Sequence, residues 1–408
     1  MNFNRLTGPS LALAVAISAS AALAQTNTAQ VETDRDAVFA QLLRAPTDRA
    51  LMLRYARLSV ELRDYEAAVS TLERLLDLDP GDTRARYELG IAYYALGSYE
   101  LARYHFGLAD QGSGLNAEER EALAAYTEGA TENLDLSRWS GEVSAGIVQA
   151  TEGDLTGQAA QLSLRWAQDM NGPDIEYWLT DLVARDLRFS DDPAQDQTHL
   201  RLRTGPWLSL QGDAYGVYLR PYLELASERD GSGDGFGDDI DAAAIGLQYR
   251  NTINAHWGTY ADFGIGRAEE VDTGIGVDYW RVALGASWRP ARQTFVRGTL
   301  RVREDTADDG DSVASQGLRI EAVHEFPVDW SPSPRDWRVA GFVQMDMADY
   351  AGAAPREDTV TGAGARLRGY VYEDIFIEGN VTWLERDSDN DSFDDQETLV
   401  GIMVGMEF

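Results

Sequence analysis

Residues 138–408 consist almost entirely of alternating segments, and this feature restricts most strongly how the chain folds. Each segment is about ten residues long, alternates large apolar with small or charged residues, and ends at turn residues, as membrane-crossing strands do. In one of them Trp280, Val282 and Leu284 share a face, because side chains of a strand point alternately to its two sides. About fourteen such segments, from 138–150 to 397–408, predict a transmembrane antiparallel β-barrel with an even number of strands.

The last segment, Thr398–Phe408, shows the pattern most clearly. Val400, Ile402 and Val404 share one face with Phe408, whereas the other face is mostly small. Lipid outside and a lumen inside produce this pattern, although the last strand of a soluble sheet is the alternative for this segment alone. A terminal aromatic residue on such a strand resembles the assembly signal of bacterial outer-membrane barrels. Phe408 is therefore predicted to be read by the barrel assembly machinery.

The predicted connections alternate in kind along the barrel region. Long or acidic loops such as SDDPAQDQ and DTADDGDS follow the odd-numbered strands. Short turns such as Arg250-Asn251-Thr252, before the strand predicted at 253–267, follow the even-numbered ones. Soluble sandwiches have alternating strands but not long loops at one end and short turns at the other. With the N-terminal region in the periplasm, the short turns and Phe408 are expected to face the periplasm and the acidic loops the outside.

Residues 1–24 are predicted to be a secretory signal peptide. Arg5 supplies its charge, residues 11–22 form an apolar run that is short for a membrane span, and Ala22-Leu23-Ala24 offers a cleavage site. The polar residues 25–34 are predicted to be a loose leader. The protein is therefore expected in the bacterial outer membrane, inserted as a barrel.

Residues 35–133 have a helical periodicity that repeats. Four residue pairs are spaced about thirty-four residues apart, which is the tetratricopeptide period; they are Tyr55/Leu89, Ala56/Gly90, Ala68/Ala102 and Leu72/Phe106. The small members let the two helices of a repeat approach closely, and the large ones fill the space between repeats. The region resembles a tetratricopeptide array and is expected to form one periplasmic helical domain. Two repeats need capping helices, expected at 35–44 and 117–132, the second with a capping box of Asn116 and Glu119.

The first helix of each repeat lines the concave surface of such an array. Projecting the repeat onto the sequence predicts a partner-binding surface of apolar, aromatic and arginine side chains, a composition common at peptide-binding sites. Its members are Leu53, Arg57, Val60, Arg84, Tyr87, Ile91 and Tyr94. The alternative is that the leading helix or the following domain covers this surface.

Composition excludes several kinds of site. The net charge of −33 argues against nucleic acid as a partner, and the absence of cysteine excludes a disulfide, a thiol nucleophile and a cysteine–zinc site. The four histidines lack metal-ligand spacing, and no nucleophile grouping or phosphate-binding loop is present, so we expect no enzyme activity, metal or cofactor. Asp387, Asp389 and Asp391 have the spacing of the start of a calcium loop, with a solvated acidic loop as the alternative.

Many arginines fall on the lumen-facing phase of the predicted strands. They either shape a passage electrostatically, as rings of charge do in pores, or pair with Glu224, Glu321 and Glu378 across the wall. We favour the second explanation. The arginines are Arg201, Arg203, Arg220, Arg281, Arg297, Arg301, Arg319, Arg366 and Arg368.

A signal peptide, a tetratricopeptide domain and a terminal barrel in this order resemble the Slam family, the surface lipoprotein assembly modifiers. The resemblance implies an α+β multidomain protein that is embedded in outer-membrane lipid. It further implies that the protein assists the translocation or surface display of a protein cargo, which can be a lipoprotein. It also implies that the helical domain binds cargo or a partner. The chain departs from the family after the first strand, where residues 149–154 read QATEGD instead of an Asp-Ser-Asn-like element.

Two other functions fit the same predicted architecture. An exopolysaccharide exporter also joins tetratricopeptide repeats to a barrel, usually with a much longer array. A diffusion porin with a scaffolding helical domain is the third possibility, since a barrel of this size is wide enough to hold water unless it is plugged.

Overall fold

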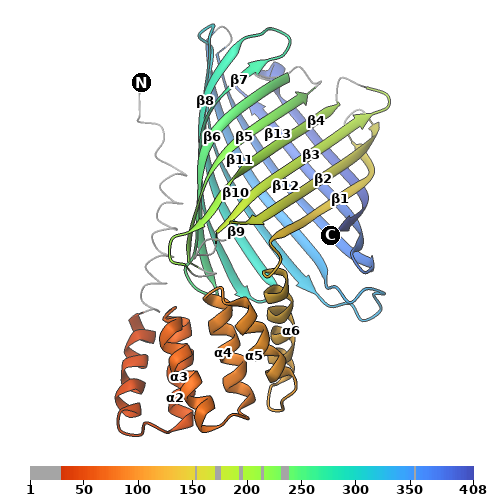
Figure 1. Cartoon of the computed structure of the whole chain (residues 1–408). Helices are drawn as coiled ribbons and strands as arrows, with labels where there is room; N and C mark the ends of the chain where they lie inside the picture. Colours follow the sequence, from red (N-terminus) through yellow and green to blue (C-terminus); the bar gives the residue numbers. More distant parts are fainter. Residues whose placement is uncertain are drawn as a thin grey trace.

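The computed structural model describes residues 29–151, 154–170, 176–192, 196–212, 216–230, 239–352 and 355–408. A layer of helices stands beneath one end of a β-barrel, and the last helix leads directly into the first strand (Figure 1). The predicted signal peptide, residues 1–24, lies outside the described residues. The combination of an N-terminal helical array and a C-terminal antiparallel barrel confirms the fold class expected from the sequence.

The barrel is closed by fourteen strands, each hydrogen-bonded antiparallel to its neighbours in the chain, with β1 and β14 pairing at the seam. This arrangement satisfies every strand edge, as a bilayer requires. The strands are β1 (Ser137–Ala150), β2 (Leu155–Asp169), β3 (Glu176–Phe189), β4 (Gln197–Ser209), β5 (Val217–Asp230), β6 (Asp239–Thr252), β7 (Trp257–Glu270), β8 (Gly276–Ala291), β9 (Thr294–Ala307), β10 (Ser312–Phe326), β11 (Trp337–Ala351), β12 (Arg356–Tyr372), β13 (Ile375–Ser388) and β14 (Asp395–Glu407).

The observed strands begin and end within a few residues of the predicted ones, with one informative error. The turn predicted at residues 250–252 is part of β6, and the turn lies instead at 253–256. Asn254 sets its position, because its side-chain oxygen accepts hydrogen bonds from the backbone N–H groups of His256 and Trp257, both at 2.9 Å. An asparagine that binds the backbone two residues on mimics a turn, and this outweighed the apolar alternation of the segment.

The connections do not differ in length as predicted. Those after odd-numbered strands range from four residues (308–311) to eight (231–238), and those after even-numbered strands from two (292–293) to ten (327–336). The expectation of long loops at one end was wrong because strands such as β9 extend into the acidic segments. Charge distinguishes the two ends instead. The connections after odd-numbered strands contain no basic residue, and all of them except residues 352–355 contain acidic residues, whereas arginines occur in the connections at the helical-domain end.

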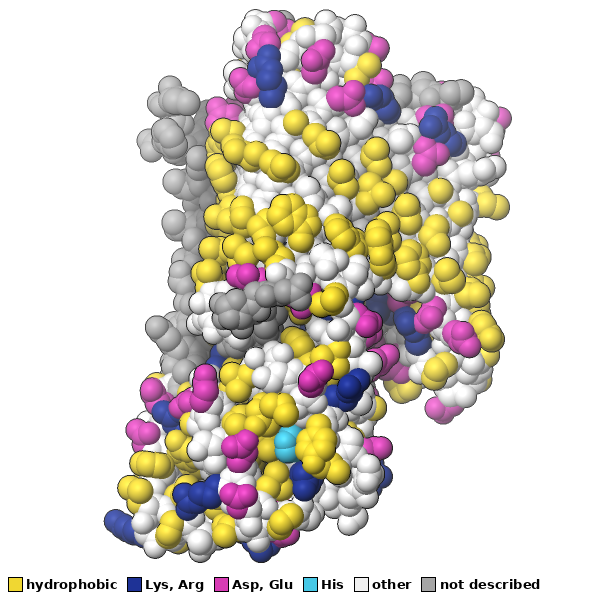
Figure 2. Space-filling view, in the orientation of Figure 1, with side chains coloured by type: hydrophobic (Ala, Val, Ile, Leu, Met, Phe, Trp, Pro, Cys, Tyr) yellow, Lys and Arg dark blue, Asp and Glu magenta, His cyan; other side chains and the backbone are white. Residues whose placement is uncertain are grey.

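The outer surface of the barrel carries an apolar band with charged residues gathered above and below it (Figure 2). On β14 the residues predicted to face lipid lie on the outside of the barrel. Ile402 is 63% exposed, and Ile147, its neighbour across the seam, is 62% exposed. Trp139 stacks on Trp166 and Trp257 on Trp288 near the helical-domain end of their strands, as in an interfacial aromatic girdle. The band and the girdle are the features that a lipid-facing surface requires.

The helical domain begins earlier than predicted. A helix covers residues 29–42, so the expected loose leader, 25–34, is helical over its described part. It is followed by α2 (Arg49–Glu61), α3 (Tyr65–Leu78), α4 (Thr83–Ala95), α5 (Tyr99–Asp110) and α6 (Ala117–Glu132). The predicted capping box is present at α6, where the Asn116 side chain accepts from the Glu119 N–H at 2.8 Å and the Glu119 carboxylate accepts from the Asn116 N–H at 2.9 Å.

The repeat positions pack as the sequence predicts. Ala56, Ala68 and Leu72 are fully buried in the core of the first repeat. In the second repeat the ring of Phe106 lies directly against the backbone of Gly90, where a Cβ atom would collide with it. The residue without a side chain therefore allows α4 and α5 to approach closely. Within the described residues, no helix has the length and apolar character needed to cross a membrane.

Candidate functional site between the helical repeats and the barrel

The apolar and aromatic residues of the predicted concave surface pack into two separate hydrophobic clusters, one in each repeat. Leu53 and Val60 of α2 pack against the core of the first repeat, and Arg57 forms an ion pair with Glu88 of α4 at 2.5 Å. On α4, Tyr87 is buried, and Ile91 and Tyr94 pack beside it in the core of the second repeat. Helix α6 packs against this part of the surface through Leu123 and Tyr126.

Paired charges hold α6 in place. Arg84 of α4 donates to both carboxylate oxygens of Glu119 in α6, each at 3.0 Å. The hydrogen bond from the Asn116 N–H, together with that from Arg84, holds the pKa of Glu119 below its ordinary value. Burial has the opposite effect on Glu88, whose pKa it raises although Arg57 partly offsets it. Predicted binding residues Arg57 and Arg84 thus form ion pairs inside the helical domain.

The depressed pKa of Glu119 predicts a pH-dependent attachment of α6. A carboxyl group with a lowered pKa in the folded state stabilises the fold above its ordinary pKa of 4.5, and this contribution is lost as the pH falls through the folded-state value. Hydrogen–deuterium exchange of α6 in the full chain should therefore accelerate below pH 4.5 more than exchange of α3. Glu119→Gln should remove most of this difference. Glu118→Gln, which changes the exposed neighbouring residue, should retain it; equal behaviour of the two variants would contradict the assignment.

Tyrosine rings line the space between the helices and the barrel. Tyr94 makes edge contacts with Tyr99 and Tyr126, each with ring centres 5.3 Å apart. Burial raises the pKa of Tyr87, on the same side of α4, to about 12. The Tyr87 hydroxyl therefore stays protonated over the physiological range, and the tyrosines together form an aromatic surface with hydrogen-bonding hydroxyl groups.

Asn133, the residue that ends α6, joins the helical domain to the barrel. Its amide donates to the Tyr94 hydroxyl at 3.4 Å, and its side-chain oxygen accepts from the Tyr177 hydroxyl of β3 at 3.2 Å. Arg138 of β1 donates to the same oxygen, and its guanidinium carbon lies 4.8 Å from the centre of the Tyr177 ring. This network orients the array over the mouth of the barrel.

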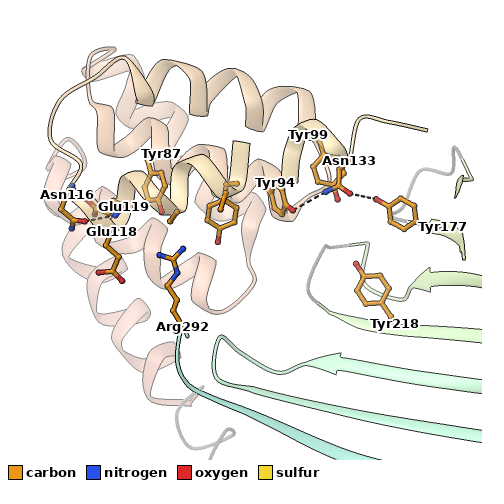
Figure 3. A pocket seen from close by; sticks show the side chains of 13 residues that line it. Tyr87, Tyr94, Tyr99, Asn116, Glu118, Glu119, Asn133, Tyr177, Tyr218 and Arg292 are labelled. Atoms are coloured by element: carbon orange, nitrogen blue, oxygen red, sulfur yellow. Dashed lines mark hydrogen bonds between the residues drawn. The ribbon is translucent and has the colours of Figure 1, made fainter. Parts of the chain in front are cut away.

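A pocket of about 750 Å³ opens beside this network, between the helices and the barrel mouth. Figure 3 shows Arg292, from the turn between β8 and β9, pointing out of the barrel toward the helices. One of its nitrogens lies 4.0 Å from a carboxylate oxygen of Glu121. The remaining lining comes from α4, α5, α6 and the first residues of β3 and β5, and comprises Tyr87, Tyr94, Tyr99, Asn116, Glu118, Glu119, Ala122, Ala125, Tyr126, Asn133, Tyr177 and Tyr218.

Only two of the seven predicted binding residues, Tyr87 and Tyr94, line this pocket directly. Sequence analysis missed the other side, because Tyr177, Tyr218 and Arg292 lie in different strands and turns whose meeting point depends on the closure of the barrel. The one available signal was the occurrence of tyrosines at the first positions of strands.

Within the lumen, most of the predicted arginines are paired. Arg203 binds Glu224 and Asp262, and Arg281 binds the same Glu224 at 2.6 Å. The same holds for Arg220 with Asp181, Arg301 with Asp346, Arg366 with Glu321, and Arg368 with Glu142, Glu378 and Glu407. Arg319 instead donates to Gln344 at 2.7 Å, and its guanidinium lies 3.7 Å from the Phe342 ring centre. These ion pairs confirm, for the arginines that form them, the favoured explanation of charge pairing along the wall.

Two further predicted lumen arginines resemble Arg319 in having no ion pair within the described part of the chain. Arg201 and Arg297 have no carboxylate within 4.0 Å among the residues that the structure describes. Arg297 instead lies over the rings of Tyr260 and Phe295, at 5.6 and 5.0 Å.

The acidic connections do not converge on a cation site in the described part of the chain. Asp389 accepts a hydrogen bond from the Glu357 N–H at 3.0 Å, and residues 391–393 form a 3₁₀ turn in the connection before β14. Over the described residues, no three histidine or acidic side chains are arranged to hold a metal ion. Another acidic connection, residues 231–238 between β5 and β6, lies outside the described residues.

Comparison with known proteins identifies the repeats of the helical domain. Residues 53–116 match the tetratricopeptide repeat family. A search of curated proteins finds no match. Among solved structures, the anion-selective porin from Comamonas acidovorans is 13% identical with a TM-score of 0.37, covering 67% of this chain and 99% of the porin. A bacterial polysaccharide outer membrane secretin is 10% identical with a TM-score of 0.38, covering 66% of this chain and 98% of the secretin. CdiB from Acinetobacter baumannii is 7% identical with a TM-score of 0.37, covering 66% of this chain and 60% of CdiB. The chain thus combines tetratricopeptide repeats with a fourteen-stranded barrel.

Proposed function

We propose that this protein is a non-enzymatic outer-membrane barrel that assists the translocation or surface display of a protein cargo. The observation that carries the proposal is the pocket between the tetratricopeptide array and the barrel mouth, because a segment bound there lies directly at the lumen entrance. Arrays of this kind present extended surfaces to polypeptide partners. The tyrosines and Arg292 of the pocket are residue types that dominate the energetics of such contacts.

The apolar outer band supports a position in the outer membrane, and the charge of the connections supports an orientation. The acidic, arginine-free connections are proposed to face outside, and the end that carries the helical domain and Phe408 to face the periplasm. In this orientation a periplasmic cargo meets the pocket before it meets the lumen. The barrel assembly machinery and outer-membrane lipid remain the other proposed partners.

Passage of small anions is the second candidate function. Arg201 and Arg297, which have no carboxylate within 4.0 Å among the described residues, favour it over an exopolysaccharide exporter. A porin of this kind has no need for the pocket, so blocking the pocket separates the two candidates.

Filling the pocket without removing any of its packing contacts tests the proposal. Ala125 of α6 is exposed and lines the pocket, so Ala125→Trp should occupy the space and abolish surface display of the cargo. The cargo to assay is a secreted protein or lipoprotein encoded beside this chain, detected by antibody on intact cells. Barrel abundance is measured in parallel as the heat-modifiable band.

Ala124→Trp is the matched control, since Ala124 is exposed on the same helix and lies outside the pocket lining. It should leave display unchanged. Equal display in the two variants, at equal barrel abundance, would refute the pocket as a cargo site. Retained display with reduced uptake of small anions would favour the porin.

A further inference from the structure

An excess of positive charge lies inside the lumen at the end that faces the helical domain. Arg250, three residues before the turn that joins β6 to β7, shares the inner face of its strand with Gln248, which binds Asp262 at 2.8 Å. No described carboxylate lies within 4.0 Å of Arg250 or of Arg297. The acid opposite Arg297 on β10 is Glu321, and it contacts Arg366 of β12 instead.

Neighbouring arginines strengthen this excess. Arg165 and Arg220 share a single carboxylate, that of Asp181, at 2.6 and 2.5 Å. Arg165, Arg289 and Arg297 all lie close enough to repel the charge of Arg250. Like charges held together beside a lumen wall create a local positive potential, even in a protein whose net charge is −33.

The opposite charge lies on the other side of the pocket. Glu118 lines the pocket from α6, and Glu121 of the same helix lies 4.0 Å from Arg292. From the helices to the lumen, the charge therefore changes from negative through Arg292 to strongly positive at Arg250. A negatively charged segment in the pocket is repelled by the helix and attracted into the barrel.

We propose that the arginine cluster formed by the exposed side chains of Arg165, Arg250, Arg289 and Arg297 binds a carboxylate-rich stretch of the cargo polypeptide as it enters the lumen. Arginine suits this role, because its planar guanidinium binds carboxylates through two parallel hydrogen bonds. A polypeptide is favoured over an anionic polysaccharide because the approach to the cluster passes the pocket of the tetratricopeptide array. The inference rests on the proposed function and specifies the chemistry of its substrate.

The test uses the purified full chain in detergent and a fluorescein-labelled oligoglutamate peptide, with binding measured by fluorescence polarisation. Measurements at an ionic strength of about 0.01 M, where the Debye length is about 30 Å, retain the electrostatic attraction. The double variant Arg250→Gln/Arg297→Gln should bind the peptide at least tenfold more weakly than the unmodified chain. Oligolysine of the same length should not bind at the cluster.

The matched control removes two charges at the opposite end of the barrel. Arg188 and Arg267 are exposed and each contacts two aspartates near the acidic connections. Arg188→Gln/Arg267→Gln should leave the affinity within about twofold of the original, which corresponds to about 0.4 kcal/mol. Equal weakening in both double variants, or no binding by the unmodified chain, would overturn the proposal. If Arg250→Gln/Arg297→Gln does not give a heat-modifiable barrel, Arg250→Gln and Arg297→Gln are measured separately. Each should then weaken binding of the peptide about threefold.

Further measurements separate this inference from the proposed function. Polygalacturonate that binds at the cluster while oligoglutamate does not would overturn the peptide assignment in favour of a polysaccharide. Intact cargo display in Arg250→Gln/Arg297→Gln would refute the acidic-segment inference and leave the pocket proposal standing. Unaffected display in Ala125→Trp, with tight oligoglutamate binding, would refute the pocket as the cargo site and support the anion-binding cluster.

Discussion

Arg368→Met is expected to destabilise the barrel by about 3–5 kcal/mol, the cost of removing one partner from a buried ion-pair network. The Arg368 side chain is 6% exposed and contacts carboxylates of three other strands, Glu142 of β1 at 2.7 Å, Glu378 of β13 at 2.8 Å and Glu407 of β14 at 2.7 Å. Without the guanidinium, three acidic groups remain close together in the wall. Two of them lie on β1 and β14, so their repulsion acts directly on the seam that closes the barrel.

Urea unfolding of the refolded barrel, followed by the heat-modifiable band and by tryptophan fluorescence, measures this loss. Arg366→Met is the matched control, because Arg366 lies two residues away on the same face of β12. Its side chain is 47% exposed and its one ion pair, with Glu321, is 3.6 Å long. A pair of this kind contributes about 1 kcal/mol or less. Similar losses for the two variants would show that Arg368 is not a special contact at the seam.

Deleting Phe408 is expected to cause a large loss of membrane-inserted protein in cells. The backbone of Phe408 closes the seam, since its N–H donates to the Gly141 carbonyl at 3.0 Å and its carbonyl accepts from the Gly141 N–H at 2.8 Å. Its ring lies over the surface of Gly141, which has no side chain of its own to cover the strand. The deletion removes both hydrogen bonds and the proposed assembly signal together.

Phe408→Ala separates these two contributions. It preserves both backbone hydrogen bonds and removes only a ring that is 49% exposed, so the refolded barrel should lose about 1 kcal/mol or less. In cells the same variant should still insert poorly if the assembly machinery reads the aromatic ring. Normal insertion of Phe408→Ala, measured as heat-modifiable protein in outer-membrane fractions, would refute the assembly signal. Loss of insertion in the deletion alone would then be explained by the missing seam bonds.

The sequence by itself determined the elements and the direction in which each one faces. Val400, Ile402 and Val404 lie together on the outer face of the barrel because the side chains of a strand point alternately to its two sides. Gly90 lets α4 and α5 approach closely, as the small residue at that position of the tetratricopeptide period predicts. The capping box of Asn116 and Glu119 was equally readable, since both of its hydrogen bonds join residues three positions apart.

Only the tertiary structure decided which of these elements meet. Local periodicity specifies the apolar face of a strand but not the register and closure of the barrel, which bring Arg368 to Glu142, far away in the sequence. For the same reason nothing in the sequence relates Tyr87 to the barrel residues Tyr177, Tyr218 and Arg292. They line one pocket only because the helices lie at the barrel mouth. The burial of Tyr87 followed instead from the packing of α5 and α6 against α4, because an exposed apolar face is stabilised by whichever neighbouring element can cover it.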